Sequence, residues 1–127
     1  MTVSVSPLAE SLSEPVLAEL VRRFYAGARL DPLLGPVFDA AVDDWDAHIA
    51  KVTAFWASAL MGARGYRGNP LAEHRKQPLT PEMFPRWLKI WGETVDAMLA
   101  PDLAEPVKAR AELIGESLKL GLFFKPD

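Results

Sequence analysis

The chain has 127 residues, of which 50% are hydrophobic and 24% charged, a balance that suits one compact domain with a sizeable core. Its 14 basic and 17 acidic residues give no broad basic surface for phosphate backbones, so nucleic acid is not an expected partner. The absence of cysteine excludes disulfides, thiolate zinc sites, iron–sulfur clusters and covalent haem attachment through C-x-x-C-H.

The first segment, residues 1–13, has no basic stretch before an apolar run, so no secretory signal is expected. Nowhere does the chain reach the roughly 18 uninterrupted apolar residues that a membrane helix requires. We therefore expect a cytoplasmic protein with no membrane segment, folded as a single domain over residues 1–127.

Apolar residues recur at helical spacing in four long stretches, and no run alternates as a half-buried strand would, which predicts an all-α fold. The first stretch begins at Ser13, a suitable N-cap, and ends near Asp31 and Pro32. The following segment, residues 32–38, is too rich in Pro and Gly for a long helix but too apolar for a solvated linker, so Phe38 is expected to point inward. One face of the first stretch carries Leu17, Leu20, Val21, Phe24, Tyr25 and Ala28.

The second stretch runs from Asp43, Asp44 and Asp46 to about Gly62. The three aspartates suit the positive end of a helix, and a cation site is disfavoured because EF-hand spacing and companion ligands are missing. By itself, His48 is expected to be a hydrogen-bonded core or boundary residue rather than a metal ligand. It lies in an arc of roughly 140° that also holds Trp45, Ile49, Val52, Phe55, Trp56, Ala59 and Leu60.

A short helix is predicted after the polar loop of residues 63–68, with Asn69 as N-cap and Pro70 as its first residue. It extends through His74 and stops before Pro78. Isolated helices below about 12 residues are marginal in water, so this one needs tertiary support. A metal bond from His74 is one candidate for this support, and packing of Leu71 is the other. Considered by itself, His74 is expected to be exposed or to hydrogen-bond within the loop rather than to bind a metal.

The third stretch carries Phe84, Trp87, Leu88, Trp91, Val95 and Met98 at helical offsets. Thr80 and Pro81 are typical of a helix start. However, Pro85 has no backbone N–H to donate, so regular helix is expected only from about Pro85. A final helix is expected after Pro106, fraying beyond Gly121. Its inward residues are Val107, Ala111, Ile114 and Leu118.

Common enzyme signatures are missing: the P-loop, H-E-x-x-H, G-x-S-x-G and a glycine-rich turn after a strand. What remains is a helical chain whose two histidines, four tryptophans and Tyr25 lie mostly on apolar faces. Taken singly, Tyr25 and Trp87 would be ordinary core residues. Taken together, these side chains suit the lining of a site for a flat apolar cofactor.

The order and spacing of several short pieces resemble a group III truncated haemoglobin over nearly the whole chain, although no single piece is specific. The joint placement of the two histidines overturns the interpretation of each alone. The pieces are Phe24-Tyr25, Leu34-Gly35-Pro36-Val37-Phe38, Trp45-x-x-His48, Phe55-Trp56, Tyr66-x-Gly68-Asn69-Pro70-x-x-x-His74 and Phe84-x-x-Trp87-Leu88.

The resemblance implies a truncated globin, a two-over-two helical sandwich in which the long stretches are helices B and E over G and H, around a non-covalent b-type haem. It implies that His74 is the proximal iron ligand, and that Phe38 packs on the macrocycle. Tyr25, His48 and Trp87 match polar distal positions, and Val52 and Phe55 would line the distal side. By helical phase we add Leu71, Leu88 and Ile114 as apolar wall. Pro85 puts the geometry just before Trp87 in doubt.

The implied function is reversible binding of O2, NO or CO at a pentacoordinate haem iron with a polar distal pocket. Hydrogen-bond donors aimed at bound O2 would slow its release, which disfavours bulk oxygen transport. The alternatives are a haem enzyme for nitric oxide dioxygenation or peroxide chemistry, a bis-histidine electron-transfer protein with His48 as sixth ligand, and a cofactor-free helical module.

A monomer is expected, since nothing resembles a coiled-coil seam. A partner reductase of unknown identity is also expected. The haem propionates need cations or hydroxyls. The pool of candidates on suitable segments is Lys51, Arg64, Tyr66, Arg67, Arg75 and Lys76.

Overall fold

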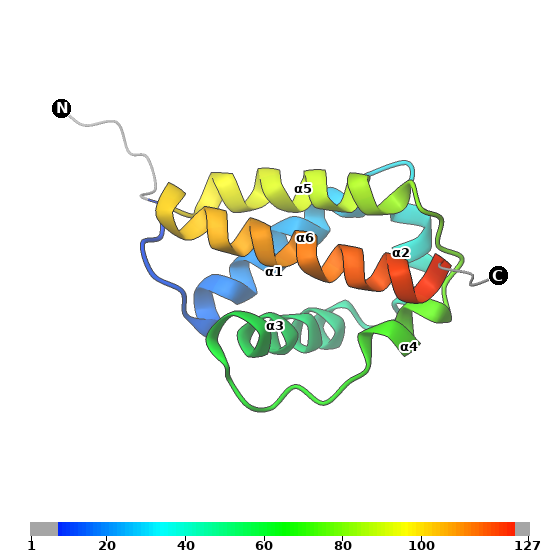
Figure 1. The fold of residues 1–127 in the computed structure, drawn as a ribbon, viewed down its shortest axis with the longest axis horizontal. Coiled ribbons are helices and arrows are strands. Elements are labelled where there is room, and N and C mark those ends of the chain that lie inside the picture. The colour runs from blue at the N-terminus through cyan, green and yellow to red at the C-terminus, as the bar shows by residue number, and fades with distance from the viewer. Residues whose placement is uncertain (1–7, 124–127) are drawn as a thin grey trace.

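The computed structural model describes residues 8–123, which form six helices (Figure 1). They are α1 (Glu14–Ala28), α2 (Gly35–Ala41), α3 (Trp45–Met61), α4 (Pro70–Arg75), α5 (Met83–Met98) and α6 (Pro101–Phe123). Within this range no helix is long and apolar enough to cross a membrane. The all-α prediction is confirmed: extended pairing among residues 8–123 is limited to one isolated bridge between Ala9 and Leu99.

Three of the helices begin where the sequence predicts, at side chains that accept a backbone N–H of the first turn. Ser13 caps α1, Asp44 caps α3 and Asn69 caps α4. The aspartates before α3 therefore include its N-cap. α3 ends at Met61 and its C-cap is Gly62, whose φ of 67° places it in the left-handed region that favours glycine.

The predicted start of α6 was wrong, whereas α5 begins two residues before Pro85, near which its start was predicted. α5 begins at Met83, so Pro85 is its third residue, where the missing N–H has no partner within the helix in any case. α6 begins at Pro101 and contains Pro106, which removes one hydrogen bond from its first turns. Burial of Ala104 against the core keeps this part of α6 helical despite that loss.

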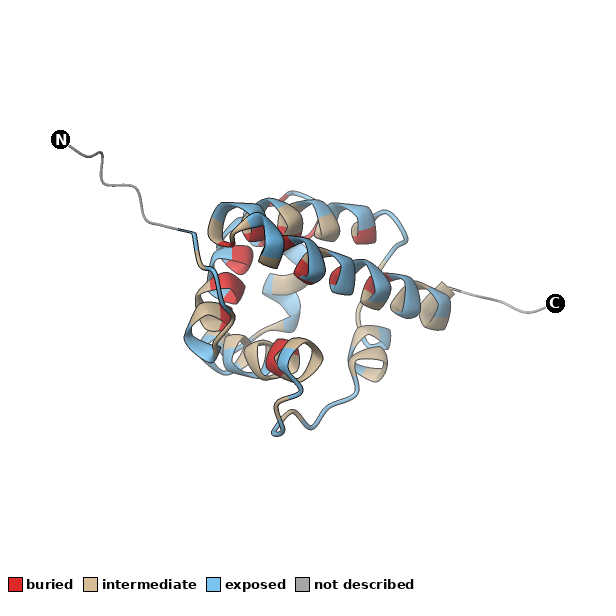
Figure 2. Ribbon diagram, turned by 60° about the vertical axis from the view of Figure 1, so that its left-hand side comes forward, coloured by how far each residue is buried: buried red, intermediate tan, exposed pale blue. Residues whose placement is uncertain are grey.

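The helices form two layers, with α1 and α3 in one and α5 and α6 in the other (Figure 1). α1 also packs against α5, and the short α4 packs against the C-terminal part of α6. Figure 2 shows buried residues concentrated where α1, α5 and α6 meet. The structure therefore has the two-over-two arrangement that the resemblance implied, with α1, α3, α5 and α6 as its B, E, G and H helices.

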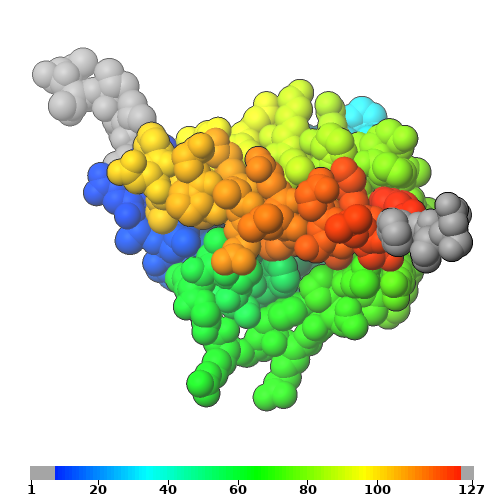
Figure 3. Space-filling view, in the orientation of Figure 1, coloured from blue at the N-terminus to red at the C-terminus, as the bar shows by residue number. Residues whose placement is uncertain are grey.

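The core contains all six residues predicted for the inward face of α1. By contrast, of the arc predicted on α3 only Trp56 is fully buried, and its other members are half-buried. The reason is that α3 meets α6 only weakly, and the side chains between them face an internal space rather than each other. In the space-filling view α6 crosses the front of the molecule above α3 and α4, and residues of the loop before α4 project away from the body (Figure 3).

A buried carboxylate ties the connection between α1 and α2 to the start of α5. Asp31, 6% exposed, accepts hydrogen bonds from the N–H groups of Leu33 and Leu34 and from Arg86 Nε at 2.5 Å. Burial favours the neutral acid, but the Leu34 N–H, the Arg86 guanidinium and the Leu33 N–H outweigh it and lower the pKa of Asp31. This charged anchor fixes where α2 and the first turn of α5 stand beside the internal space.

Candidate functional site

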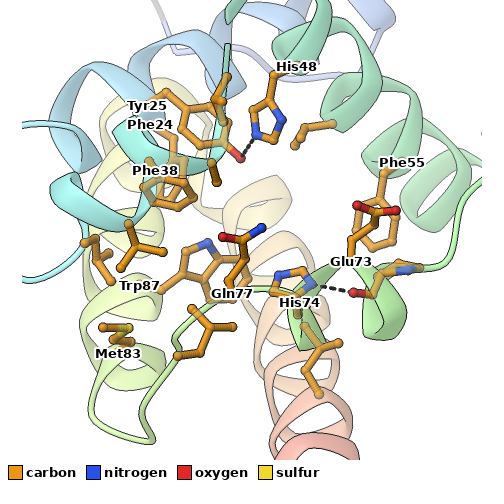
Figure 4. Close-up of a pocket in the computed structure, with 18 of the residues that line it drawn as sticks. Phe24, Tyr25, Phe38, His48, Phe55, Glu73, His74, Gln77, Met83 and Trp87 are labelled. Atoms are coloured by element: carbon orange, nitrogen blue, oxygen red, sulfur yellow. Dashed lines mark hydrogen bonds between the residues drawn. The ribbon is translucent and has the colours of Figure 1, made fainter. Parts of the chain in front are cut away.

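The internal space is a cavity of about 300 Å³ to which every helix contributes side chains (Figure 4). This volume is at the lower end of the roughly 300–1,000 Å³ found for small-molecule and cofactor sites. Its walls are mostly aromatic and aliphatic, with a few polar groups that converge from opposite sides. A large apolar ligand with limited polar recognition fits such a lining.

His74 stands on one side of the cavity, on the six-residue helix α4. Its Nδ1 lies 2.5 Å from the backbone oxygen of Pro70, one turn earlier. A carbonyl oxygen only accepts, so Nδ1 carries the proton and donates. In a neutral imidazole Nε2 then keeps a free lone pair, and Figure 4 shows the ring projecting into the cavity. This is the tautomer and orientation that a metal-binding histidine requires.

Tyr25 and His48 form a polar pair on the opposite side (Figure 4). The Tyr25 hydroxyl lies 2.9 Å from His48 Nε2, and the two rings meet edge to face. Burial raises the pKa of Tyr25, which keeps its hydroxyl protonated. Burial, followed by the charge of Lys51 and by that of His74 whenever its ring is protonated, lowers the pKa of His48, so the His48 imidazole is neutral at neutral pH.

The remaining proton positions of this pair have a functional consequence. If His48 Nε2 carries its proton, it donates to the phenol oxygen of Tyr25, and the Tyr25 O–H is free to donate into the cavity. If Nε2 is bare, Tyr25 donates to it instead and is no longer a donor for a ligand. The tautomer of His48 thus decides whether Tyr25 can hydrogen-bond a molecule in the cavity.

The cavity brings together eight of the ten residues proposed from the sequence. Phe38 packs edge to face on Tyr25, with ring centroids 5.2 Å apart, and the Trp87 indole projects into the cavity from α5 (Figure 4). The eight are Tyr25, Phe38, His48, Val52, Phe55, His74, Trp87 and Ile114.

Leu71 and Leu88 do not line the cavity. Leu71 turns toward α6, where its methyl groups occupy the space that a Cβ at Gly121 would take. Leu88 follows Trp87, and adjacent residues on a helix point about 100° apart, so with Trp87 facing the cavity Leu88 faces α6 beside Gly115. Leu71 thereby supplies the packing support that the short α4 needs.

Several lining residues were missed by the sequence argument. Gln77 projects its amide into the cavity close to His74 (Figure 4), and Met83 and Leu79 add apolar wall. Gln77 and Leu79 belong to the irregular connection between α4 and α5, where no periodicity indicates a direction. Met83 was missed because the start of α5 was placed too late.

The mouth of the cavity carries charges of both signs. Of the cation and hydroxyl pool, Lys51 and Tyr66 line the cavity, whereas Arg64, Arg67, Arg75 and Lys76 do not. Glu73 lines it too and pairs with Lys76 at 3.3 Å. Burial, and then the Glu73 carboxylate, raise the pKa of Tyr66.

Among residues 8–123, no three His, Asp or Glu side chains gather as a metal-binding group. A metal ion bound at His74 would therefore need its other ligands from a cofactor that brings the ion with it, as a porphyrin does.

Comparisons with known proteins agree with this geometry. A sequence profile of the bacterial-like globin family matches residues 13–113. The group 3 truncated hemoglobin ctb of Campylobacter jejuni is 32% identical over 119 residues, covering 90% of this chain and 94% of that protein. The crystal structure of the group III truncated hemoglobin from Campylobacter jejuni is similar with a TM-score of 0.88 and 30% identity, covering 95% of this chain and 99% of that one.

Proposed function

Because this chain belongs to the group III truncated haemoglobins of the bacterial-like globin family, we propose that it binds a b-type haem and reversibly binds O2, NO and CO at a pentacoordinate iron. The observation that carries the proposal is the position of the proton on His74 and the orientation of its ring. Its Nδ1 donates to the Pro70 carbonyl, and its ring presents the other nitrogen to an apolar cavity.

The residues present fit a haem. Phe38, Val52 and Phe55 offer apolar contacts to a flat ring, and the absence of cysteine requires that the ring be held without covalent attachment. Lys51 lines the cavity and is exposed, so its ammonium is placed to pair with a propionate. When bound, haem supplies an iron centre that takes up diatomic gases; holding the ring and shaping the space around it is the work of the side chains.

The polar distal side consists of Tyr25, His48 and Trp87. Tyr25 and Trp87 are both capable of donating a hydrogen bond toward a diatomic molecule in a space that excludes most water, where such bonds are strengthened. The nitrogen with which His48 would otherwise approach a metal is already engaged by the Tyr25 hydroxyl at 2.9 Å. This contact supports the pentacoordinate proposal over the bis-histidine alternative.

Donors of this kind favour retention of O2 over rapid release, so we propose ligand binding without a role in bulk transport. A haem enzyme acting on nitric oxide or peroxide remains the alternative, because it would profit from a held and polarised ligand. Mixing the oxygenated protein with nitric oxide, and measuring nitrate and turnover with a reductant, separates binder from catalyst. The partner reductase, the monomeric state and the cytoplasmic location stay predictions of the sequence.

The optical spectrum of the reduced protein, with and without CO, tests the proposal. A pentacoordinate iron gives a broad high-spin spectrum without CO and a sharp, shifted Soret band with it. Sharp low-spin bands before CO, together with little CO uptake, would favour the bis-histidine protein. If hemin titration, followed by removal of free hemin, left no protein-bound Soret band, haem binding would be refuted.

A further inference from the structure

Trp45 contacts both members of the polar pair, Tyr25 and His48, but does not line the cavity itself. The centroid of its ring lies 5.3 Å from that of Tyr25 and 5.7 Å from that of His48, and both contacts are edge to face. Trp45 is the first residue of α3, and His48 follows one turn later on the same face of the helix. Trp45 therefore packs behind the polar pair and not against a molecule in the cavity.

A cation from the end of α1 covers the face of the Trp45 ring. The guanidinium carbon of Arg29 lies 4.2 Å from the ring centroid, within the range of a cation–π contact. Arg29 is the C-cap of α1 and follows Tyr25 by four residues, so both side chains project toward α3. The Nε of Arg29 donates to Asp39 Oδ1 on α2 at 3.2 Å, which orients the guanidinium. Three layers thus separate the cavity from solvent: the polar pair, the indole of Trp45 and the ion pair of Arg29 and Asp39.

The outer two layers restrict the ring of His48 more than they stabilise the fold. The side chains of Arg29 and Asp39 are 45% and 54% exposed, and an ion pair this exposed contributes little to stability. The ring of His48 is half-buried and is joined to Tyr25 by one hydrogen bond, whose net contribution is small. Packing against Trp45 is therefore what keeps the His48 ring from turning toward solvent.

From this arrangement we propose that Trp45, held in place by Arg29, is a positioning residue that keeps His48 in contact with Tyr25 and thereby slows the release of bound O2. The inference rests on the proposed haem binding. It extends that proposal to two residues outside the cavity, one of them at the protein surface. Without the Trp45 ring, His48 turns outward, the Tyr25 hydroxyl loses the partner that orients it, and water reaches the bound O2.

The first test changes only the surface layer and measures displacement of O2 by CO in the reduced, haem-loaded protein. Arg29→Gln removes the cation from the Trp45 ring, and O2 should dissociate about two- to fivefold faster, the range that a cation–π contact at an exposed site allows. Arg23→Gln is the matched control, because Arg23 is also an exposed arginine of α1 but pairs with Glu19, at 2.8 Å. The control should release O2 at the wild-type rate, and an equal rate in Arg29→Gln would overturn the inference.

The second test removes the indole itself and separates positioning from a general loosening of the fold. Trp45→Leu keeps an apolar side chain but has no ring, and we expect it to speed O2 release more than Arg29→Gln does. The same substitution made in His48→Leu should add little, because the side chain that Trp45 positions is then absent. If the effects of Trp45→Leu and His48→Leu were fully additive, Trp45 would act independently of His48 and the inference would be wrong.

The position of the His48 ring is measured directly by NMR in the reduced, CO-loaded protein, which is diamagnetic. Nuclear Overhauser contacts between the ring protons of Tyr25 and His48 should be present in the wild type, weaker in Arg29→Gln and lost in Trp45→Leu. If Trp45→Leu does not fold, Arg29→Gln at the surface decides the question. Undiminished contacts in Arg29→Gln, or in folded Trp45→Leu, would overturn the inference and leave haem binding intact. A wild-type chain that takes up no hemin would overturn the proposed function as well.

Discussion

Replacing Tyr25 with phenylalanine removes the hydroxyl and keeps the ring on which Phe38 packs. Tyr25 is 7% exposed, so water cannot take over its hydrogen bond to a ligand. Hydrogen bonds to charged groups contribute about 1.5–3 kcal/mol. Since about 1.4 kcal/mol corresponds to a factor of ten, O2 should dissociate about tenfold to a hundredfold faster from Tyr25→Phe.

The assay is stopped-flow displacement of O2 by CO in the reduced, haem-loaded protein. Tyr66→Phe is the comparison variant, because it deletes the hydroxyl of the only other tyrosine in the chain. Tyr66 also lines the cavity, but it packs on Phe55 beside the charge of Glu73 and is not part of the pair of Tyr25 and His48, so its O2 dissociation rate should stay close to that of the wild type. An unchanged rate in Tyr25→Phe would refute the role of its hydroxyl as a donor.

A double-mutant cycle with His48→Leu tests the tautomer argument. If His48 donates to the Tyr25 oxygen and so directs its proton into the cavity, His48→Leu alone also speeds O2 release. It then adds little once Tyr25 is already phenylalanine, because the two residues act as one unit. Fully additive effects would show that His48 acts on the ligand independently.

Three further predictions concern stability and are measured by urea unfolding. The pKa of His48 in the folded protein lies below its ordinary 6.5, so the unfolded chain takes up a proton more readily as the pH falls. The free energy of unfolding should therefore decrease as the pH falls through 6.5, and less so in His48→Gln, whereas an equal decrease would contradict the cause given. Asp31→Ala should cost about 3 kcal/mol because it leaves two backbone donors and a guanidinium without their acceptor. The matched change Asp39→Ala, in an ion pair whose side chains are 54% and 45% exposed, should cost at most about 0.5 kcal/mol, and equal losses would refute the special role of Asp31. Gly62→Ala should cost about 1–2 kcal/mol, all of it from the positive φ, since an added Cβ would have no neighbour within 4 Å; a neutral result would show that this turn adapts freely.

Local signals in the sequence predicted much of the fold. The caps Ser13 and Asn69 were identified correctly because a capping side chain acts on the N–H groups of its own first turn. The inward face of α1 followed from its helical period. Pro85 placed the predicted start of α5 two residues late, although the N–H of the third residue of a helix has no partner within the helix. Pro106 misled at α6 because burial of Ala104 holds the turn before it, and such tertiary contacts leave no local trace in the sequence.

The site was predicted in part, and its gaps have physical reasons. Helical phase gives the direction of a side chain but not the element that it contacts. Leu71 and Leu88 were therefore predicted to line the wall of the cavity, whereas both pack on α6. Gln77 lies in an irregular connection whose path is set by the helices on either side. The hydrogen bond from His74 to Pro70 depends on rotamers that spacing alone does not fix.

The central claim is that the imidazole of His74 binds the iron of a haem, and hemin titration of the wild type, His74→Gly and His48→Gly tests it most directly. The wild type and His48→Gly should take up hemin and, once reduced, bind CO. His74→Gly should lose hemin readily, and added imidazole should restore its spectrum by occupying the vacated position. If His74→Gly instead kept hemin as firmly as the wild type, with the same spectrum and no response to imidazole, the claim would be contradicted.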